Sequence, residues 1–442
     1  MPLKNQLIIF YKEIFHNEER IFKWGFLFFN LGLFFLASAP ILGVAAILIS
    51  MILSYFQKKD ATKARRINRL LNIVSALLLI ITLISIFYKI NQFQEWQFTS
   101  NIIGLFNWIP FFICFFLIQP FLKKTKYRTI SIYFLLIGTF PIFITGFGEY
   151  YFGWNNQLST LNGNIIWFLK PKNELKGLSG LFSNSNYTAS WLTMIWPLAL
   201  GIILKNTKNK FKMIFSLVYG LIILLLVFLT NSKDTLISLF IPIIFLFNQS
   251  FLNYTILASI ATISFFLYEK YFIKLGLNTL FLSIWNKSID FEFNNLLEIF
   301  PRIDIWRVSL IAIFNKPLLG WGAASFPLIY NLYKDKSIND LILHSHNLFL
   351  ETSISYGLIF SVLLFFIVFK VLINSWKIIF KKNKNIINKC WWISTFIFIF
   401  NHMLDVTYYD VRISLFFWIM LAGLNSIINE DQITNNIKFK SF

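Results

Sequence analysis

The sequence predicts an all-α polytopic membrane protein with about twelve transmembrane helices and one large external loop that contains short helices. Three observations predict this fold class. Hydrophobic residues make up 57% of the 442-residue chain, the mean hydropathy is +0.65, and only 14% of the residues are charged. Soluble proteins carry about 25% charged residues. The composition therefore excludes a soluble globular protein.

The predicted helices follow from the apolar runs. A helix that crosses a bilayer needs about 20 mainly apolar residues, and shorter stretches are tolerated where the bilayer thins. Pro40 separates the first two runs, which are short and form either a tight hairpin or one broken helix. In chain order the runs lie near residues 24–38, 41–56, 70–88, 107–121, 129–146, 187–204, 213–230, 233–248, 252–268, 347–374, 390–404 and 411–428.

Basic loops set the predicted orientation of these helices. Lys and Arg collect in the cytoplasmic loops of membrane proteins. Four connections carry 19 basic residues against the single acid Asp60, namely 57–69, 123–128, 205–212 and 377–389. They hold most of the net charge of +20, so the charge reports topology and does not indicate a nucleic-acid-binding surface. The remaining connections, 89–106, 147–186, 269–346 and 405–410, then face the other side of the membrane.

The longest outer connection, 269–346, has 8 basic and 7 acidic residues. A structureless loop of this length is uncommon, so we expect short amphipathic helices on the outer surface, for example at 302–314. The chain then divides into three parts. These are an N-terminal bundle of about nine spans (1–268), a large periplasmic loop (269–346), and C-terminal transmembrane helices with a cytoplasmic tail (347–442).

Two of the outward-facing features lie in the N-terminal part. The stretch "GLSGLFSNSNYTASWL" (177–192) is a Gly, Ser and Asn-rich approach to a helix that begins near Tyr187. Asn186 is either the N-cap of this helix or part of a site. Further on, Lys233 and Asp234 interrupt a long apolar stretch. They form either an interfacial turn with a self-contained ion pair or a cationic position that receives an anionic headgroup.

The other two features lie in and after the large loop. Arg302 and Arg307 point about 140° apart on a helix, so they do not share one anion. Arg302 is the better phosphate ligand, with a solvated surface arginine as the alternative. His344 and His346 in "LILHSHNLFLE" share one side of an extended segment. Without a third ligand they make a weak metal site, so we predict no metal. Each is either a hydrated interfacial histidine or a general base.

Taken in order, the motifs resemble those of the O-antigen ligase and polymerase superfamily over about residues 175–375. They are Gly-Leu-Phe-x-Asn-x-Asn (180–186), Ser-Lys (232–233), Arg-x-x-x-Trp (302–306), Pro-Leu-Leu-Gly-x-Gly (317–322) and His-Asn-x-x-Leu followed by Gly (346–357). Cyanobacterial membrane proteins once named for inorganic-carbon accumulation are similar over the same motifs.

The resemblance implies a membrane glycosyltransferase of the GT-C type with about twelve spans in the bacterial inner membrane. Such enzymes move a glycan from undecaprenyl-pyrophosphate to an acceptor hydroxyl on the periplasmic face, with inversion and without a metal or cofactor. The implied partners are the lipid-linked donor, a glycan, lipid or protein acceptor, and membrane lipids, with no nucleic acid. Ligases, which act in lipopolysaccharide biosynthesis, and polymerases form the same bond and differ in the acceptor.

The resemblance also assigns roles to residues. His346, which directly precedes Asn347, corresponds to the catalytic base, and Arg302 corresponds to a pyrophosphate ligand. Lys233 stands where the family usually has an arginine, which keeps the charge and loses the bidentate fork. The candidate supporting residues are His344, Asn347, Asn186 and Glu351.

A secondary transporter of bicarbonate or a polysaccharide is the alternative from a different class. Transporters carry ionisable residues or broken helices near the bilayer midplane. Here the predicted spans are mostly uniformly apolar, and the ionisable residues cluster at the outer face. His402 and Asp405, near the outer end of the eleventh span, are the main features that favour a transporter. We interpret them as interfacial or supporting residues.

Overall fold

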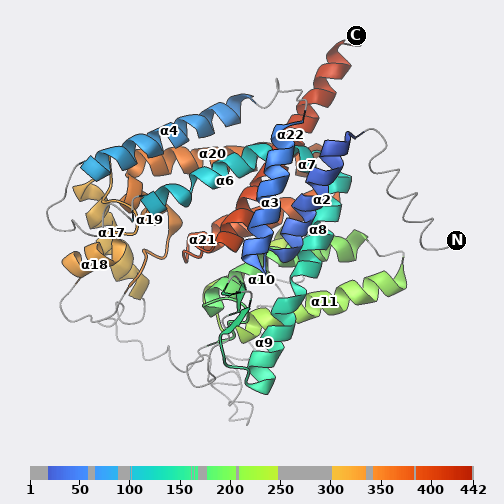
Figure 1. Ribbon diagram of the computed structural model, residues 1–442, viewed down its shortest axis with the longest axis horizontal. Coiled ribbons are helices and arrows are strands. Elements are labelled where there is room, and N and C mark those ends of the chain that lie inside the picture. The colour runs from blue at the N-terminus through green and yellow to red at the C-terminus, as the bar shows by residue number, and fades with distance from the viewer. Residues whose placement is uncertain are drawn as a thin grey trace, which may run out of the picture.

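The computed structural model describes residues 18–57, 65–87, 100, 102–160, 162–163, 165–167, 177–205, 209–246, 301–334, 342–382 and 385–440. Within these ranges the chain is mostly helical (Figure 1). Its elements are α2 (Arg20–Phe35), α3 (Pro40–Tyr55), α4 (Arg65–Phe87), α6 (Ile109–Leu117), α7 (Gln119–Leu122), α8 (Thr125–Gly138), α9 (Phe140–Phe152), β1 (Leu158–Thr160), β2 (Ile165–Trp167), α10 (Ser185–Lys205), α11 (Lys210–Leu229), α12 (Lys233–Ser238), α13 (Ile241–Leu246), α17 (Pro301–Asn315), α18 (Phe326–Tyr333), α19 (Leu348–Tyr356), α20 (Leu358–Trp376), the π-helix η3 (Lys377–Lys382), α21 (Ile386–His402) and α22 (Val411–Lys440).

Five of the described helices are long and apolar enough to cross a membrane: Thr125–Phe152, Ser185–Lys205, Lys210–Leu229, Leu358–Lys381 and Val411–Gln432. At a rise of 1.5 Å per residue, a helix of 20 residues spans about 30 Å, which matches the hydrocarbon core of a bilayer. Other predicted segments form shorter apolar helices, such as Pro40–Tyr55 and Arg69–Ile84. The predicted span at 252–268 lies outside the described residues. A helical membrane protein is therefore confirmed, and the count of about twelve spans is not.

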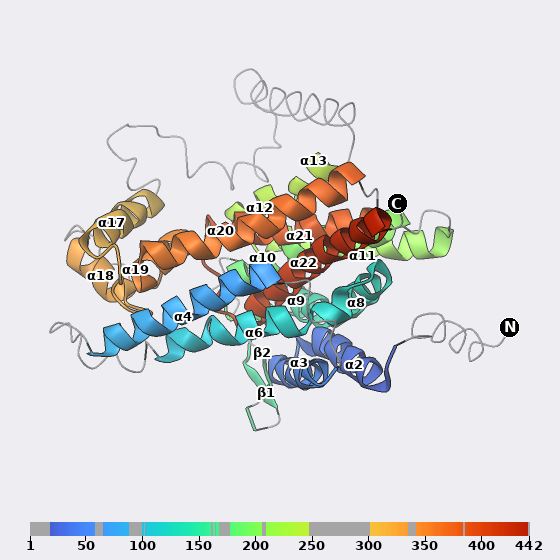
Figure 2. The same ribbon diagram turned by 90° about the horizontal axis from the view of Figure 1, so that it is seen from above.

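The first two predicted segments form a hairpin and not one broken helix. Pro40 begins α3, and α2 packs closely against it. The two helices approach each other at glycine, because a Cβ added to Gly32 would lie 2.5 Å from Cγ1 of Ile47. The antiparallel pair β1 and β2 lies next to this hairpin in Figure 2. Trp167 at its end donates from Nε1 to the carbonyl of Ser38, 2.8 Å away.

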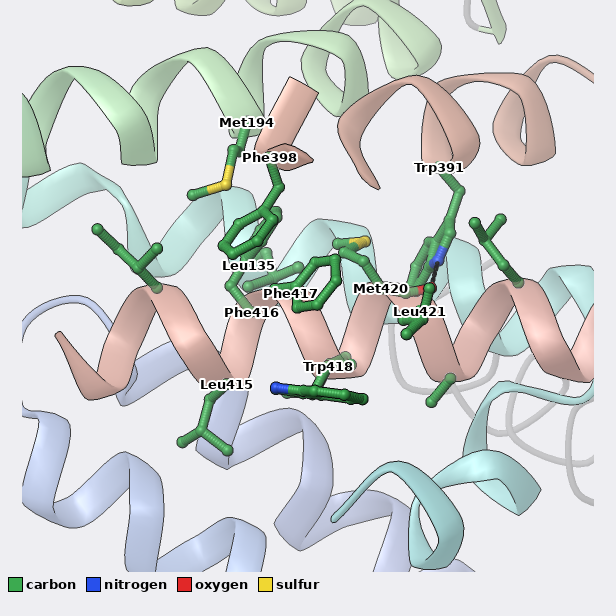
Figure 3. Close-up of a cluster of buried hydrophobic side chains, with 14 of the residues drawn as sticks. Leu135, Met194, Trp391, Phe398, Leu415, Phe416, Phe417, Trp418, Met420 and Leu421 are labelled. Atoms are coloured by element: carbon green, nitrogen blue, oxygen red, sulfur yellow. Dashed lines mark hydrogen bonds between the residues drawn. The ribbon is translucent and has the colours of Figure 1, made fainter. Parts of the chain in front are cut away.

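The interior of the bundle is built around α22. Its side chains point to several sides and are nearly all buried as far as residue 428 (Figure 3). A helix that is apolar all round belongs in the interior. Trp391 of α21 donates from Nε1 to the carbonyl of Met420, at 2.8 Å. The helix α10 packs against both α21 and α11. The polar residues described below lie at the ends of these helices.

Three helices meet at the basic end of the bundle. The buried Arg128, near the start of α8, donates from Nε and Nη2 to Oδ1 of Asn388 at 3.1 and 3.0 Å. Its Nη2 also lies 3.7 Å from Oε2 of Glu430 in the second half of α22. The start of α8, the start of α21 and the distal part of α22 thus lie together, beside the basic loops 123–128 and 377–389.

The helices α17, α18 and α19 pack around a separate small core at one edge of the molecule (Figures 1 and 2). The sequence predicted a helix at 302–314, and the helix α17 confirms it. The core consists of Ile305, Val308, Ala312, Ile313, Trp321, Phe326, Ile329, Tyr330 and Ile354.

Two glycine-containing motifs join α17 to α19. The segment 317–322 bonds to the end of α19 through Trp321 N to Ile354 O at 2.7 Å, and through Leu358 N to Pro317 O, also at 2.7 Å. Gly357 has a φ of 86°, and a Cβ there would lie 2.1 Å from Leu318 O. Only glycine fits this crossing, which fixes α17 relative to the chain that follows His346.

Candidate functional site

A buried carboxylate is bound by donors from two distant parts of the chain and from its own loop. Asp405, between α21 and α22, is 9% exposed. Its Oδ1 lies 2.8 Å from Nδ1 of His346 and accepts from Val406 N at 2.9 Å. Its Oδ2 accepts from Nδ2 of Asn186, at the start of α10, at 2.8 Å. The loop before α19, the loop before α22 and the start of α10 therefore meet at Asp405.

His346 has an unusual backbone conformation that its neighbours hold in place. Its φ is 52°, in the left-handed region that few residues other than glycine adopt. Asn347 caps α19 by accepting from two backbone amides and donates from Nδ2 to the carbonyl of Met403 at 3.0 Å. The carboxylate of Glu351, 2% exposed, accepts from the backbone N of Ser345 at 2.9 Å. These contacts fix the histidine from both sides.

His344 lies beside His346. The centroids of the two rings are 4.4 Å apart, and Nδ1 of His344 is 4.0 Å from Oδ1 of Asp405. The positive charge of Arg302 acts on His344. Arg307 pairs with Asp304, at 2.6 Å. That the two arginines do not share one anion stays a prediction.

The ionisation states follow from these contacts. Burial opposes ionisation of Asp405, but the hydrogen bond and charge of His346 outweigh it and hold the pKa of Asp405 at about 2. Burial, with the charges of His346 and Arg302, lowers the pKa of His344 to about 4 against the attraction of Asp405. At neutral pH Asp405 is thus ionised and only accepts hydrogen bonds. Nδ1 of His346 therefore donates to this carboxylate, and in the neutral imidazole Nε2 is then the acceptor nitrogen.

The loop that delivers Asn186 is held by a second buried carboxylate. Glu149, near the end of α9, accepts from the backbone N of Ser179 at 3.0 Å and of Gly180 at 2.6 Å. The helix α10 then begins at Ser185, and Oδ1 of Asn184 accepts from Asn186 N at 2.9 Å. Capping therefore belongs to Asn184, and the interpretation of Asn186 as the N-cap is wrong. Its side chain reaches Asp405 instead.

Lys233 lies at the same end of the bundle. It begins α12, and its side chain is exposed. The turn before it packs on the loop that leads to Asn186, because Leu178 N donates to Leu229 O at 3.1 Å. A Cβ on Gly177 would lie 1.8 Å from Thr230 O, so this contact requires glycine. The side chain of Asp234 lies outside the described residues, so its pairing with Lys233 stays a prediction.

Sequence reasoning missed two ionised groups that shape the site. It interpreted Asp405 as an interfacial or supporting residue and did not pair it with His346. It also passed over Arg412, which pairs with Asp410, donates to Leu181 O at 3.2 Å and lies 3.7 Å from the ring centroid of Phe182. The signal was present in the sequence. Two acids and an arginine within residues 405–412 interrupt an otherwise apolar C-terminal region.

The basic loops and the site lie at opposite ends of the same helices. The start of α21 contacts Arg128, and its far end leads to Asp405. The helix α22 begins next to the site and runs toward Glu430. The arrangement defines a polytopic helical membrane protein with a histidine–carboxylate site at one end of its bundle.

Comparison with known families agrees with this class. Residues 185–367 match the family model described as O-antigen ligase. This match over residues 185–367 supports the resemblance to the O-antigen ligase and polymerase superfamily that the motifs predicted, and it favours a glycosyl-transferring membrane enzyme. The match includes His346, Arg302 and Lys233 and ends before Asp405. No curated protein gives a significant match to the chain.

Proposed function

We propose that the protein transfers a glycan from undecaprenyl-pyrophosphate to an acceptor hydroxyl at the periplasmic face of the bacterial inner membrane. The observation that carries the proposal is the hydrogen bond between His346 and Asp405, with the histidine inside the matched domain. The end of the bundle with the basic loops is the cytoplasmic end by the distribution of Lys and Arg. The site at the other end then faces the periplasm.

In the proposed reaction His346 is the general base. Asp405 holds the proton on Nδ1, and Nε2 takes the proton of the acceptor hydroxyl as its oxygen attacks the anomeric carbon. The bond from this carbon to the pyrophosphate oxygen breaks, and the pyrophosphate stays on the lipid. A single displacement inverts the anomeric carbon. Asp405 stabilises the imidazolium that forms, and Asn186 keeps the carboxylate oriented.

Arg302 and Lys233 supply positive charge for the departing pyrophosphate. Arg302 can donate two parallel hydrogen bonds to a phosphate, whereas Lys233 acts as a point charge. Because pyrophosphate is a good leaving group, positioning and charge neutralisation provide much of the catalysis. The scheme uses no metal or cofactor. The outer loop 269–346, of which only residues 301–334 and 342–346 are among the described residues, is expected to form the lid and the acceptor platform in this proposal.

The test replaces His346 in the purified protein. His346→Asn is preferable to alanine because asparagine adopts the left-handed conformation more readily, so the fold is retained. Transfer of a labelled glycan from a polyprenyl-pyrophosphate donor should fall by about 10²-fold or more. His16→Asn, the same change at a histidine outside the matched segment, is the control. A His346→Asn protein that transfers at the rate of the control would disprove the role of His346.

The product distinguishes the two members of the superfamily. A ligase attaches a preassembled chain to a different acceptor, so a reaction with a labelled acceptor gives one shifted band. A polymerase uses another lipid-linked glycan as acceptor and gives a ladder. Uptake of bicarbonate or polysaccharide into liposomes that lack any lipid-linked sugar would instead favour the transporter.

A further inference from the structure

We infer that His344, His346 and Asp405 form a binding site for a divalent transition-metal ion such as Zn²⁺, and that metal bound there inhibits glycan transfer. The binding half of this inference stands on geometry alone. The inhibitory half rests on the proposed role of His346 as general base.

The three side chains already lie within ligating reach of one another. One ligand atom from each residue lies within 4.8 Å of the others. The distances from Oδ1 of Asp405 are 2.8 Å to Nδ1 of His346 and 4.0 Å to Nδ1 of His344. With bonds of about 2.1 Å, tetrahedral Zn²⁺ places its ligand atoms roughly 3.4 Å apart. The two distances lie on either side of this value, so small side-chain rotations would bring the three ligand atoms to the spacing that Zn²⁺ requires.

The third ligand was what the sequence pattern lacked. Two histidines at i and i+2 are a weak metal site by themselves, and the acid that completes the set is 59 residues from His346. Two imidazoles and one carboxylate are a ligand set that Zn²⁺ accepts, with a fourth position for water. Both histidine side chains are about one quarter exposed, at 23% and 24%, so an ion can reach them.

A second observation points to a ligand at the same place. Nδ1 of His344 is buried and has no hydrogen-bond partner within the described part of the chain. Buried polar atoms are almost always paired in native proteins. This nitrogen faces the carboxylate of Asp405 without reaching hydrogen-bond distance. A metal ion between the two groups would give it a partner.

The surroundings set the expected strength of the site. Asn186 and the backbone N of Val406 bind the carboxylate and orient it, as outer partners do in metal sites. The positive charge of Arg302 acts at His344 and opposes a cation. One carboxylate with a nearby arginine suits a reversible site more than a permanent structural one.

Metal binding removes the base in either coordination mode. An ion on Nε2 of His346 occupies the lone pair that would accept the hydroxyl proton. An ion on Nδ1 displaces the hydrogen bond to Asp405 and leaves the proton on Nε2. In both cases the imidazole cannot accept a proton from the acceptor.

Cobalt reports on binding independently of activity. The full-length protein in detergent is titrated with Co²⁺, whose visible absorption band intensifies in four- or five-coordinate sites. We expect one equivalent to bind to the wild type and to a Cys114→Ala, Cys390→Ala variant, since both thiols are buried. The band should be lost in His344→Ala, in His344→Gln and in Asp405→Asn proteins that elute as the wild type does. An unchanged band in both His344 variants, or no band in the wild type, would overturn the metal site.

Zinc titrations of the transfer rate test the inhibitory half. Each protein is compared with its own rate in a chelator. We expect Zn²⁺ to inhibit the wild type, and His344→Ala to need about tenfold more Zn²⁺ for half-inhibition. If Co²⁺ binds and Zn²⁺ leaves the rate unchanged, the inhibitory role is wrong and the site remains. If Co²⁺ binds to a protein that transfers no glycan in the chelator, the proposed function fails, together with the inhibitory half that rests on it.

Discussion

Replacement of Asp405 by asparagine separates the function of its charge from that of its shape. The introduced amide would fill the same space and could still accept one hydrogen bond from His346, but the change would remove the negative charge that lies 2.8 Å from Nδ1. Hydrogen bonds to charged groups contribute about 1.5–3 kcal/mol. The side chains of His346 and Asp405 are 24% and 11% exposed, so water screens the pair only in part. A loss of about 3 kcal/mol corresponds to a reduction on the order of a hundredfold in kcat.

The assay is glycan transfer from a polyprenyl-pyrophosphate donor by purified protein. Because the charge acts mainly on the imidazolium that forms during the reaction, KM for the donor should change by less than about threefold. Asp431→Asn is a matched control, since it makes the same change toward the other end of α22, and its rate should stay within about twofold of the wild type. Equal rates for the two variants would refute the role of Asp405. If KM instead rose on the order of a hundredfold and kcat stayed unchanged, Asp405 would only shape the binding site.

Three further predictions concern the framework of the molecule. Gly357→Ala should destabilise the protein by about 3 kcal/mol or more, because the backbone conformation of Gly357 is almost restricted to glycine and Leu318 O lies 2.1 Å from the added Cβ. The control is Gly153→Ala, where φ is 64° and no atom lies within 4 Å of the added Cβ. This substitution should cost only about 1 kcal/mol. Thermal unfolding in detergent measures both, and equal shifts would contradict the steric argument. Glu149→Gln should lower the transfer rate about tenfold by loosening the loop before Asn186, and limited proteolysis should show faster cleavage there; an unchanged cleavage rate would count against it. Burial opposes ionisation of Glu18, but hydrogen bonds from Lys124, Tyr127 and Lys123 lower the pKa of this carboxylate below 4.5. The folded pKa is thus depressed, so the stability that Glu18 adds over Glu18→Gln should be complete above pH 4.5 and disappear as the pH falls below it; a difference independent of pH between 7 and 3 would contradict this.

The predicted helices were recovered best where local composition determines the structure. The apolar runs beginning at 187 and 213 coincide with α10 and α11, whose length and hydropathy are properties of the segment itself. The run 233–248 instead divides into α12 and α13, with Pro242 at the start of the second helix. A hydropathy average extends across such a break, and it therefore overestimates the length of a continuous helix.

The candidate site shows the limits of local patterns more clearly. Asn347 was predicted only as a supporting residue, and the structure shows that it caps α19. The partner of His346 was not predicted, because Asp405 reaches it only when the loop between α21 and α22 lies against the loop before α19. The first residue of α10 decides which asparagine caps the helix, and the helix begins at Ser185, two residues before the predicted start. With Asn184 as acceptor for the first turn, Asn186 faces the site, and the sequence "NSN" does not reveal which asparagine takes which task.

The left-handed backbone conformation of His346 lowers the stability of the fold, whereas the proposed activity needs a histidine at this position. A left-handed conformation costs a non-glycine residue about 1–2 kcal/mol, and glycine carries no such penalty. His346→Gly should therefore relax the backbone at the point where it removes the proposed base. A screen that rewards only thermal stability would favour the inactive chain. In the proposed mechanism, the geometry that brings His346 and His344 to one carboxylate serves the chemistry against the conformational preference of the residue itself.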